Sequence, residues 1–123
     1  MANDGIHKVV WAEVPVTDLA AAQKFYETVL GWPTTLEEDG PNPMVMIGSG
    51  EGNIVAGHLY PGTPAPRGTG NTVHFSAKDN LEAALARVGP AGGEVVSPII
   101  TIPAGRFAYF LDPDGNSIGL FMP

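Results

Sequence analysis

Cysteine is absent from this chain of 123 residues, and basic residues are scarce. Without thiols, the chain can form no disulfide, no thiolate nucleophile and no cysteine-type zinc site. Six Lys and Arg stand against thirteen Asp and Glu, which gives a formal net charge of −7. Binding to nucleic acid or to an anionic membrane surface depends on clustered positive charge. We therefore expect neither nucleic acid nor a membrane as a partner.

Long apolar runs are missing as well. No segment approaches the roughly 20 apolar residues that a membrane span needs. The first residues, MANDGIHK, lack the apolar stretch of a secretory signal, so a cytoplasmic protein is expected. The length suits a single domain over residues 1–123. Sixteen glycines and twelve prolines indicate many turns between short strands.

The first half of the chain predicts one helix among four strands. Residues 9–16 alternate with period two, and Trp11 and Glu13 lie on the face opposite the small aliphatic side chains. Asp18 can cap a helix over 18–30 that ends before Gly31. Further strands are expected at residues 32–38, 44–47 and 53–60.

The second half repeats that order of elements. A strand is expected at 72–77, with His74 on the face opposite its apolar side chains. Asp79 or Asn80 can cap the following helix, which should stop at the Gly-Pro pair 89–90. Strands are then expected at residues 94–97, 106–111 and 117–122. The DPDG turn between the last two has type I preferences and should make them a hairpin.

This internal duplication predicts the fold class. The chain is expected to be an α+β protein of two βαβββ modules, one over about residues 6–60 and one over about 72–123. The segment 61–71, rich in Pro and Gly, would link them across the surface. An α+β domain without internal duplication is the alternative.

Four stretches of the chain resemble one known family, the vicinal oxygen chelate superfamily, which includes glyoxalase I, bleomycin-resistance proteins and extradiol dioxygenases. These stretches read EVPVTDLAAAQKFYETVLGW, TVHFSAKDNLEAALARV, GGEVV and GRFAYFLDPDGNSIGLF. The resemblance implies a mixed sheet that curls around a central cup, with the helices outside. It also implies a small-molecule site in the cup and a homodimer.

Metal-using members of that family hold one divalent ion with four side chains from the first and last strands of the modules. The resemblance places these positions at Trp11, His74 and Gly119, and at either Gly57 or His58. An indole nitrogen has no lone pair to donate and glycine has no side chain. We therefore expect no metal cofactor. The remaining donors for a divalent ion would be His74, His58 and Glu13.

The cup positions also supply candidates for catalysis and binding. Glu13 and His74 are the candidate acid–base pair, because enolisation next to a carbonyl needs a positioned base. Trp11 offers a stacking surface, and Arg106 either clamps an anionic group of a substrate or pairs with an acidic residue. The candidate substrate-binding residues together are Trp11, Glu13, His74, Ser76, Arg106 and Gly119.

Three classes of function follow. The first is a binding protein of the resistance or sequestration type, with a small hydrophobic or aromatic molecule in the cup. The second is a glyoxalase-like lyase, isomerase or dioxygenase, acting without metal through Glu13 and His74 or with a reduced metal site. The third is a regulatory or interaction domain. The fold alone does not choose among them, because one fold hosts many functions.

Overall fold

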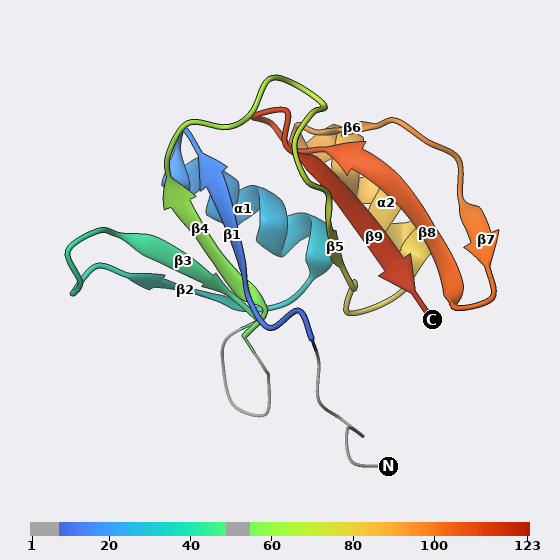
Figure 1. Cartoon of the computed structure of the whole chain (residues 1–123), viewed down its shortest axis with the longest axis horizontal. Helices are drawn as coiled ribbons and strands as arrows, with labels where there is room; N and C mark the ends of the chain where they lie inside the picture. The colour runs from blue at the N-terminus through green and yellow to red at the C-terminus, as the bar shows by residue number, and fades with distance from the viewer. Residues whose placement is uncertain (1–7, 49–54) are drawn as a thin grey trace, which may run out of the picture.

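The computed structural model describes residues 8–48 and 55–123, which form two helices and nine strands (Figure 1). The elements are β1 Ala12–Val16, α1 Leu19–Leu30, β2 Thr34–Glu37, β3 Met44–Ile47, β4 Gly57–Pro61, β5 Val73–Phe75, α2 Leu81–Ala91, β6 Glu94–Val95, β7 Ile100–Ile102, β8 Gly105–Leu111 and β9 Ser117–Met122. The expected α+β class is confirmed: the first half is βαβββ, and the second repeats that order with one additional strand, β7, after α2. No helix among these residues is long and apolar enough to cross a membrane.

The strands form two mixed sheets. Sheet A has the order β1-β4-β3-β2, with β1 parallel to β4 and the other neighbours antiparallel. Sheet B has the order β5-β9-β8-β6, with β5 parallel to β9, and β7 pairs with β8 beside it. Figure 1 shows both helices on the far side of the two sheets. The face of each sheet turned away from the helices is called its open face below.

The first helix, α1, begins and ends where the sequence predicts. The Asp18 carboxylate accepts a hydrogen bond from the N–H of Ala21 at 3.0 Å, as an N-cap does. Gly31 follows the helix with φ 82°, a left-handed conformation that glycine adopts without strain. The face that α1 buries consists of Ala22, Phe25, Tyr26, Val29 and Leu30.

The second helix, α2, runs past its predicted end. Pro90 lies in its last turn, and the helix closes at Gly92, which has φ 113°. The prediction of a stop at residues 89–90 was wrong, because a proline so close to the end removes little of the backbone hydrogen bonding. The N–H of Gly93 still donates to the carbonyl oxygen of Val88.

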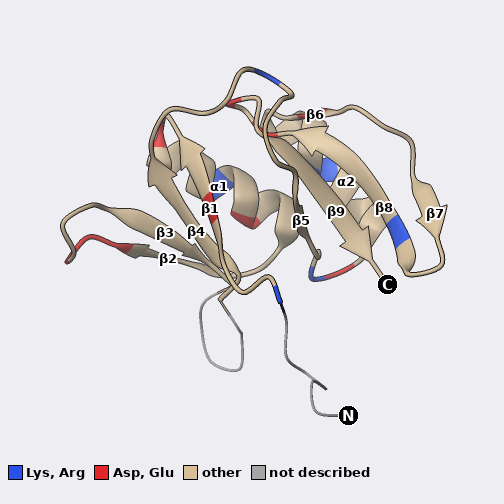
Figure 2. Cartoon of the chain, in the orientation of Figure 1, with Lys and Arg blue, Asp and Glu red and all other residues tan. Residues whose placement is uncertain are grey.

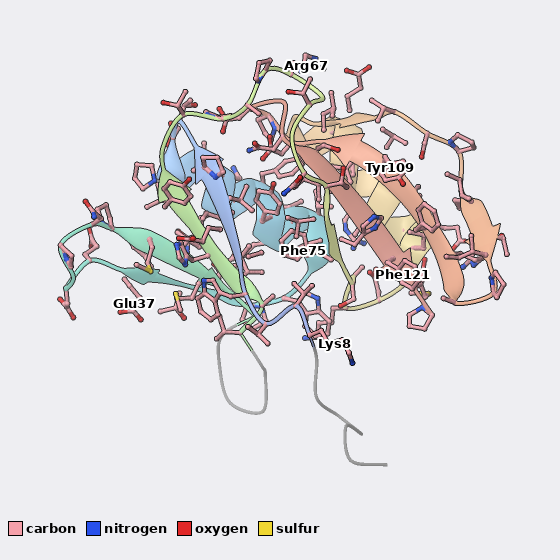
Figure 3. The ribbon with its side chains drawn as sticks, viewed as in Figure 1. Lys8, Glu37, Arg67, Phe75, Tyr109 and Phe121 are labelled. Carbon is pink, nitrogen blue, oxygen red and sulfur yellow. The ribbon has the colours of Figure 1, made fainter. Side chains whose placement is uncertain are left out.

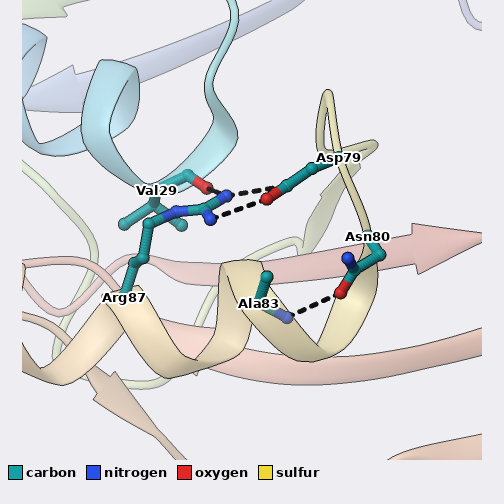
Figure 4. A network of polar contacts seen from close by, with 5 residues as sticks. All are labelled: Val29, Asp79, Asn80, Ala83 and Arg87. Carbon is teal, nitrogen blue, oxygen red and sulfur yellow. Dashed lines mark hydrogen bonds and ion pairs between the residues drawn. The ribbon is translucent and has the colours of Figure 1, made fainter.

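At its other end, α2 separates the two residues offered as caps. Asn80 is the N-cap and accepts from the N–H of Ala83 at 2.8 Å. Asp79 instead accepts two hydrogen bonds from Arg87, both at 2.8 Å (Figure 4). These hydrogen bonds hold the pKa of Asp79 well below its usual range. Because Arg87 also donates to the carbonyl oxygen of Val29, it ties α2 to the end of α1.

The strand predictions differ from the structure mainly at the ends. β3 and β9 have the predicted bounds, whereas the strands predicted at 9–16, 32–38, 72–77 and 94–97 are shorter. The strand predicted at 53–60 is observed from Gly57, and residues 53 and 54 lie outside the described part of the chain. β7 was not predicted, because Ile100–Ile102 follows a proline in a segment without clear alternation.

One apolar core lies between the sheets and the helices. Alternate strand residues face it, so that Val14, Val45, Leu59, Phe110 and Leu120 are all buried. Phe75 from β5 lies in the same core, and its ring is 6.0 Å from the ring of Tyr26 on α1 (Figure 3). Residues from both halves of the chain therefore share one core.

A buried polar network also joins the two halves. Asp112, 1% exposed, accepts a hydrogen bond from the hydroxyl of Tyr26 at 2.7 Å. It also accepts from the backbone N–H groups of Asp114 and Asn116 in the β8–β9 turn. The side-chain amide of Asn116 donates both to Asp112 and to the carbonyl oxygen of Pro15 in β1. The predicted DPDG turn is thus confirmed. Its first residue, Asp112, also links the turn to α1.

Candidate functional site

The open face of sheet A carries a chain of three hydrogen-bonding side chains. β1 and β4 run parallel, and Glu13 is aligned with His58 across them. The indole N–H of Trp11 donates to Nδ1 of His58 at 2.9 Å. Nε2 of the same imidazole lies 3.3 Å from a carboxylate oxygen of Glu13. The sequence left open whether Gly57 or His58 faces the site. In the structure His58 is on the open face, and Gly57 is buried next to β1.

The donors and acceptors of this chain fix the tautomer of His58. An indole N–H can only donate, so Nδ1 of His58 accepts and carries no proton. In neutral imidazole the proton is then on Nε2, which faces the Glu13 carboxylate. We infer this proton position from the hydrogen-bond partners. The chain Trp11–His58–Glu13 orients the indole ring, which remains 42% exposed.

The open face of sheet B carries a cluster of aromatic rings around His74. Its imidazole lies 5.5 Å from the ring of Phe107, 5.6 Å from Tyr109 and 6.1 Å from Phe121, measured between ring centres. Phe107 and Phe121 stack on each other with an angle of 10° between their planes. Tyr109 and Phe121 are labelled on this sheet in Figure 3. We call these four residues the sheet B aromatic cluster.

Gly119 makes the position of His74 possible. It is aligned with His74 on one side and with Tyr109 on the other. A Cβ at residue 119 would overlap the His74 ring, so any larger residue would displace the imidazole. Partial burial lowers the pKa of His74, because desolvation disfavours the charged form. His74 is therefore a neutral ring among aromatic rings at pH 7.

The residues at the four family metal positions do not fit a metal ion. The indole of Trp11 offers no lone pair, and Gly119 has no side chain. His58 already uses Nδ1 to accept from Trp11 and directs Nε2 at Glu13. The described residues contain no group of three or more His, Asp or Glu side chains that could hold an ion. A divalent ion would need a donor set that these side chains do not supply.

The structure separates the other predicted site residues. Glu13 and His74 lie on different sheets, and within residues 8–48 and 55–123 no hydrogen bond or ion pair joins them. Arg106 is bound to Glu82 of α2 at 2.6 Å, which places it away from the open face. That contact raises the pKa of Arg106 and lowers that of Glu82. Ser76 follows β5, and its backbone carbonyl oxygen accepts from the Trp32 indole at 2.9 Å.

Sequence reasoning missed the aromatic partners of His74. The run RFAYF places Phe107 and Tyr109 on one face of β8, and Phe121 shares the corresponding face of β9. The alternation was visible, but apolar rings in a strand normally indicate core. Their position opposite the buried Ala108 and Phe110 was the signal that could have revealed an open-face cluster.

A separate groove runs between the two helices. Its volume is about 490 Å³. The residues that line it are Ala21, Lys24, Phe25, Thr28, Ala86, Arg87, Pro90 and Ala91. None of the predicted site residues is among them, and the groove lies on the helix side of the sheets. It is therefore distinct from the open faces that carry Trp11 and His74.

Two curated relatives match most of this chain. The CFP32 protein of Mycobacterium bovis, whose name describes it as a presumed glyoxylase, is 34% identical over 122 residues. The anthracycline biosynthesis protein DnrV of Streptomyces peucetius is 32% identical over 125 residues. Each match covers 90% of this chain but only 44% or 45% of the relative. The chain thus spans about half the length of these relatives.

The fold matches solved structures along almost its whole length. TnmS3, described as an antibiotic binding protein from Streptomyces sp. CB03234, superposes with a TM-score of 0.63 and is 30% identical. That match covers 97% of this chain and 98% of the other. A family model matches residues 6–120. The chain belongs to the Glyoxalase/Bleomycin resistance protein/Dioxygenase superfamily.

Proposed function

We propose that this chain binds a small aromatic or hydrophobic molecule on its open faces, without a metal ion. The observation that carries the proposal is an exposed, oriented indole on one open face and a cluster of half-buried aromatic rings on the other. Trp11 is 42% exposed and is held by His58. The sheet B aromatic cluster occupies the matching face of the second sheet. Exposed apolar surface of this kind often marks a binding site.

The energetic argument rests on ring contacts. Aromatic side chains present large rigid surfaces, and stacked or edge-to-face pairs add about 0.5–1.5 kcal/mol to the effect of burial. Because a hydrogen bond to His58 already holds Trp11, little side-chain entropy is lost when a ligand covers its face. Two relatives point in the same direction, since one is named for anthracycline biosynthesis and one as an antibiotic binding protein.

Acid–base catalysis by Glu13 and His74 has less support than the binding of a small molecule. Glu13 lies beside His58 instead, and both nitrogens of that imidazole are engaged. His74 is surrounded by rings and has a lowered pKa, so it is a poor source of protons at pH 7. A reaction that uses both residues would require the ligand to bridge the two sheets.

We also propose that the chain acts as a homodimer. β1 ends sheet A and β5 ends the paired path of sheet B, so each of these two strands pairs on one side only among the described strands. Exposed strand edges are features that a second copy can cover. Light scattering at micromolar concentration should report twice the 12.8 kDa chain mass. A single species at the monomer mass would overturn this proposal.

The binding proposal is tested with ligands that differ only in aromaticity. Calorimetric titration with 1-naphthalenemethanol should show saturable binding, whereas its saturated analogue, decahydronaphthalenemethanol, should bind at least about fivefold more weakly. The difference reflects ring–ring contacts worth about 1 kcal/mol. Equal affinity for the two compounds would mean that the rings do not select aromatic ligands. If neither compound binds, and larger polycyclic quinones do not bind either, the proposal is wrong.

A further inference from the structure

We infer that the open-face site takes an aromatic cation, with its ring against Trp11 and its protonated amine beside Glu13. This inference rests on the proposed function and adds a charge class to it. The observations behind it are the distribution of charge over the strands, the exposed indole of Trp11 and a Glu13 oxygen without a partner among the described residues.

Positive charge is nearly missing from the strands. Among the described strands, Arg106 in β8 is the one cationic residue, and Glu82 neutralises it. Figure 2 shows the remaining strands without Lys or Arg, whereas acidic residues occur on β1, β2 and β6. Two other arginines are also paired, Arg67 with Glu94 and Arg87 with Asp79. An anionic ligand on the open faces would therefore find no free guanidinium on a strand.

The exposed rings favour a cation for a second reason. The face of an aromatic ring is the negative end of its quadrupole and attracts ammonium groups, most strongly in Trp. Trp11, which is 42% exposed, supplies such a ring on the open face of sheet A. His74 does not oppose this, because burial lowers its pKa and leaves the imidazole neutral at pH 7.

Glu13 supplies the counter-charge at the Trp11 end. It is two residues from Trp11 on the same face, and its side chain is 66% exposed. One carboxylate oxygen lies near Nε2 of His58, and within the described residues the other oxygen has no partner. His58 thus holds the carboxylate through one oxygen and leaves the other directed to the open face. An amine next to the indole would meet both the ring and this oxygen.

The test uses three naphthalene compounds of one shape and three charges. At pH 7.5, 1-naphthylmethylamine is a cation, 1-naphthalenemethanol is neutral and 1-naphthylacetate is an anion. Calorimetry should rank their affinities in that order, with the amine about fivefold tighter than the alcohol. That factor corresponds to about 1 kcal/mol, shared between an exposed ion pair and one cation–π contact. In Glu13→Gln, the ratio of amine to alcohol affinity should fall to about twofold, because only the cation–π contact with Trp11 remains.

The control is Glu37→Gln, which removes the same charge from β2, away from Trp11. It should preserve the fivefold ratio, so that net charge alone is excluded as the cause. Equal affinities of the wild-type chain for the three compounds, or a ratio that persists in Glu13→Gln, would overturn the inference while the proposed binding function stands. Absence of binding by all three would overturn both.

Discussion

Replacement of Asp112 with alanine is expected to lower the free energy of unfolding by about 3 kcal/mol or more. The carboxylate is 1% exposed and accepts from Tyr26, from two backbone N–H groups and from the amide of Asn116. Each buried donor left without an acceptor costs about 1–3 kcal/mol. Because the network joins α1, β1 and the β8–β9 turn, its loss weakens the contact between the two halves of the chain.

The measurement is urea denaturation of Asp112→Ala beside two other variants. Tyr26→Phe removes one hydrogen bond of the network and should cost about 1–2 kcal/mol. Asp39→Ala removes an exposed acid and should change stability by less than about 0.5 kcal/mol. If Asp112→Ala were no less stable than Asp39→Ala, the network would have no structural importance. The raised pKa of Tyr26, caused first by burial and then by Asp112, keeps its hydroxyl a donor throughout.

The second large effect concerns the ligand. Trp11→Ala should weaken the binding of 1-naphthalenemethanol by about tenfold or more, because the stacking of one ring on an aromatic side chain is worth about 1–3 kcal/mol. Trp11→Phe keeps a ring but loses the hydrogen bond to His58, so its loss should be smaller, about threefold. Isothermal calorimetry on all three proteins gives the comparison directly.

The matched control for Trp11 is Leu36→Ala. Leu36 is 44% exposed, close to the 42% of Trp11, but it is aligned with the buried Val45 and so lies on the other face of sheet A. This variant should bind the naphthalene compound as the wild-type chain does. If Leu36→Ala and Trp11→Ala lost affinity equally, binding would reflect general surface hydrophobicity and not the oriented indole.

Sequence alone predicts the parts of this fold that depend on local rules. Asp18 and Gly31 bracket α1 because capping is decided within a few residues. Pro90 shows where a local rule fails: a proline usually ends a helix, but within the last turn the neighbouring glycines complete the end of α2. The short strand β7 forms by pairing with β8. The residues of β7 have no sequence pattern of their own that predicts a strand.

The site was predictable in its positions but not in its contacts. Period-two alternation placed Trp11 and Glu13 on one face, and the structure agrees. Whether Gly57 or His58 shares that face depends on the parallel register of β1 and β4, which is set by residues far apart in the chain. The partner of Glu13 could therefore not be predicted, and neither could the placement of the His74 ring in the space that Gly119 leaves.

The most direct test of the binding account is the response of the indole signals to a ligand. A two-dimensional 1H–15N NMR spectrum resolves the side chains of Trp11 and Trp32, the two tryptophans of the chain. Titration with 1-naphthalenemethanol should shift the Trp11 indole signal and the backbone signals of Glu13 and His58, and all should saturate together. The Trp32 indole and the groove residues Ala21 and Ala86 should stay in place. Saturable shifts confined to Ala21 and Ala86, with Trp11 unmoved, would contradict the account.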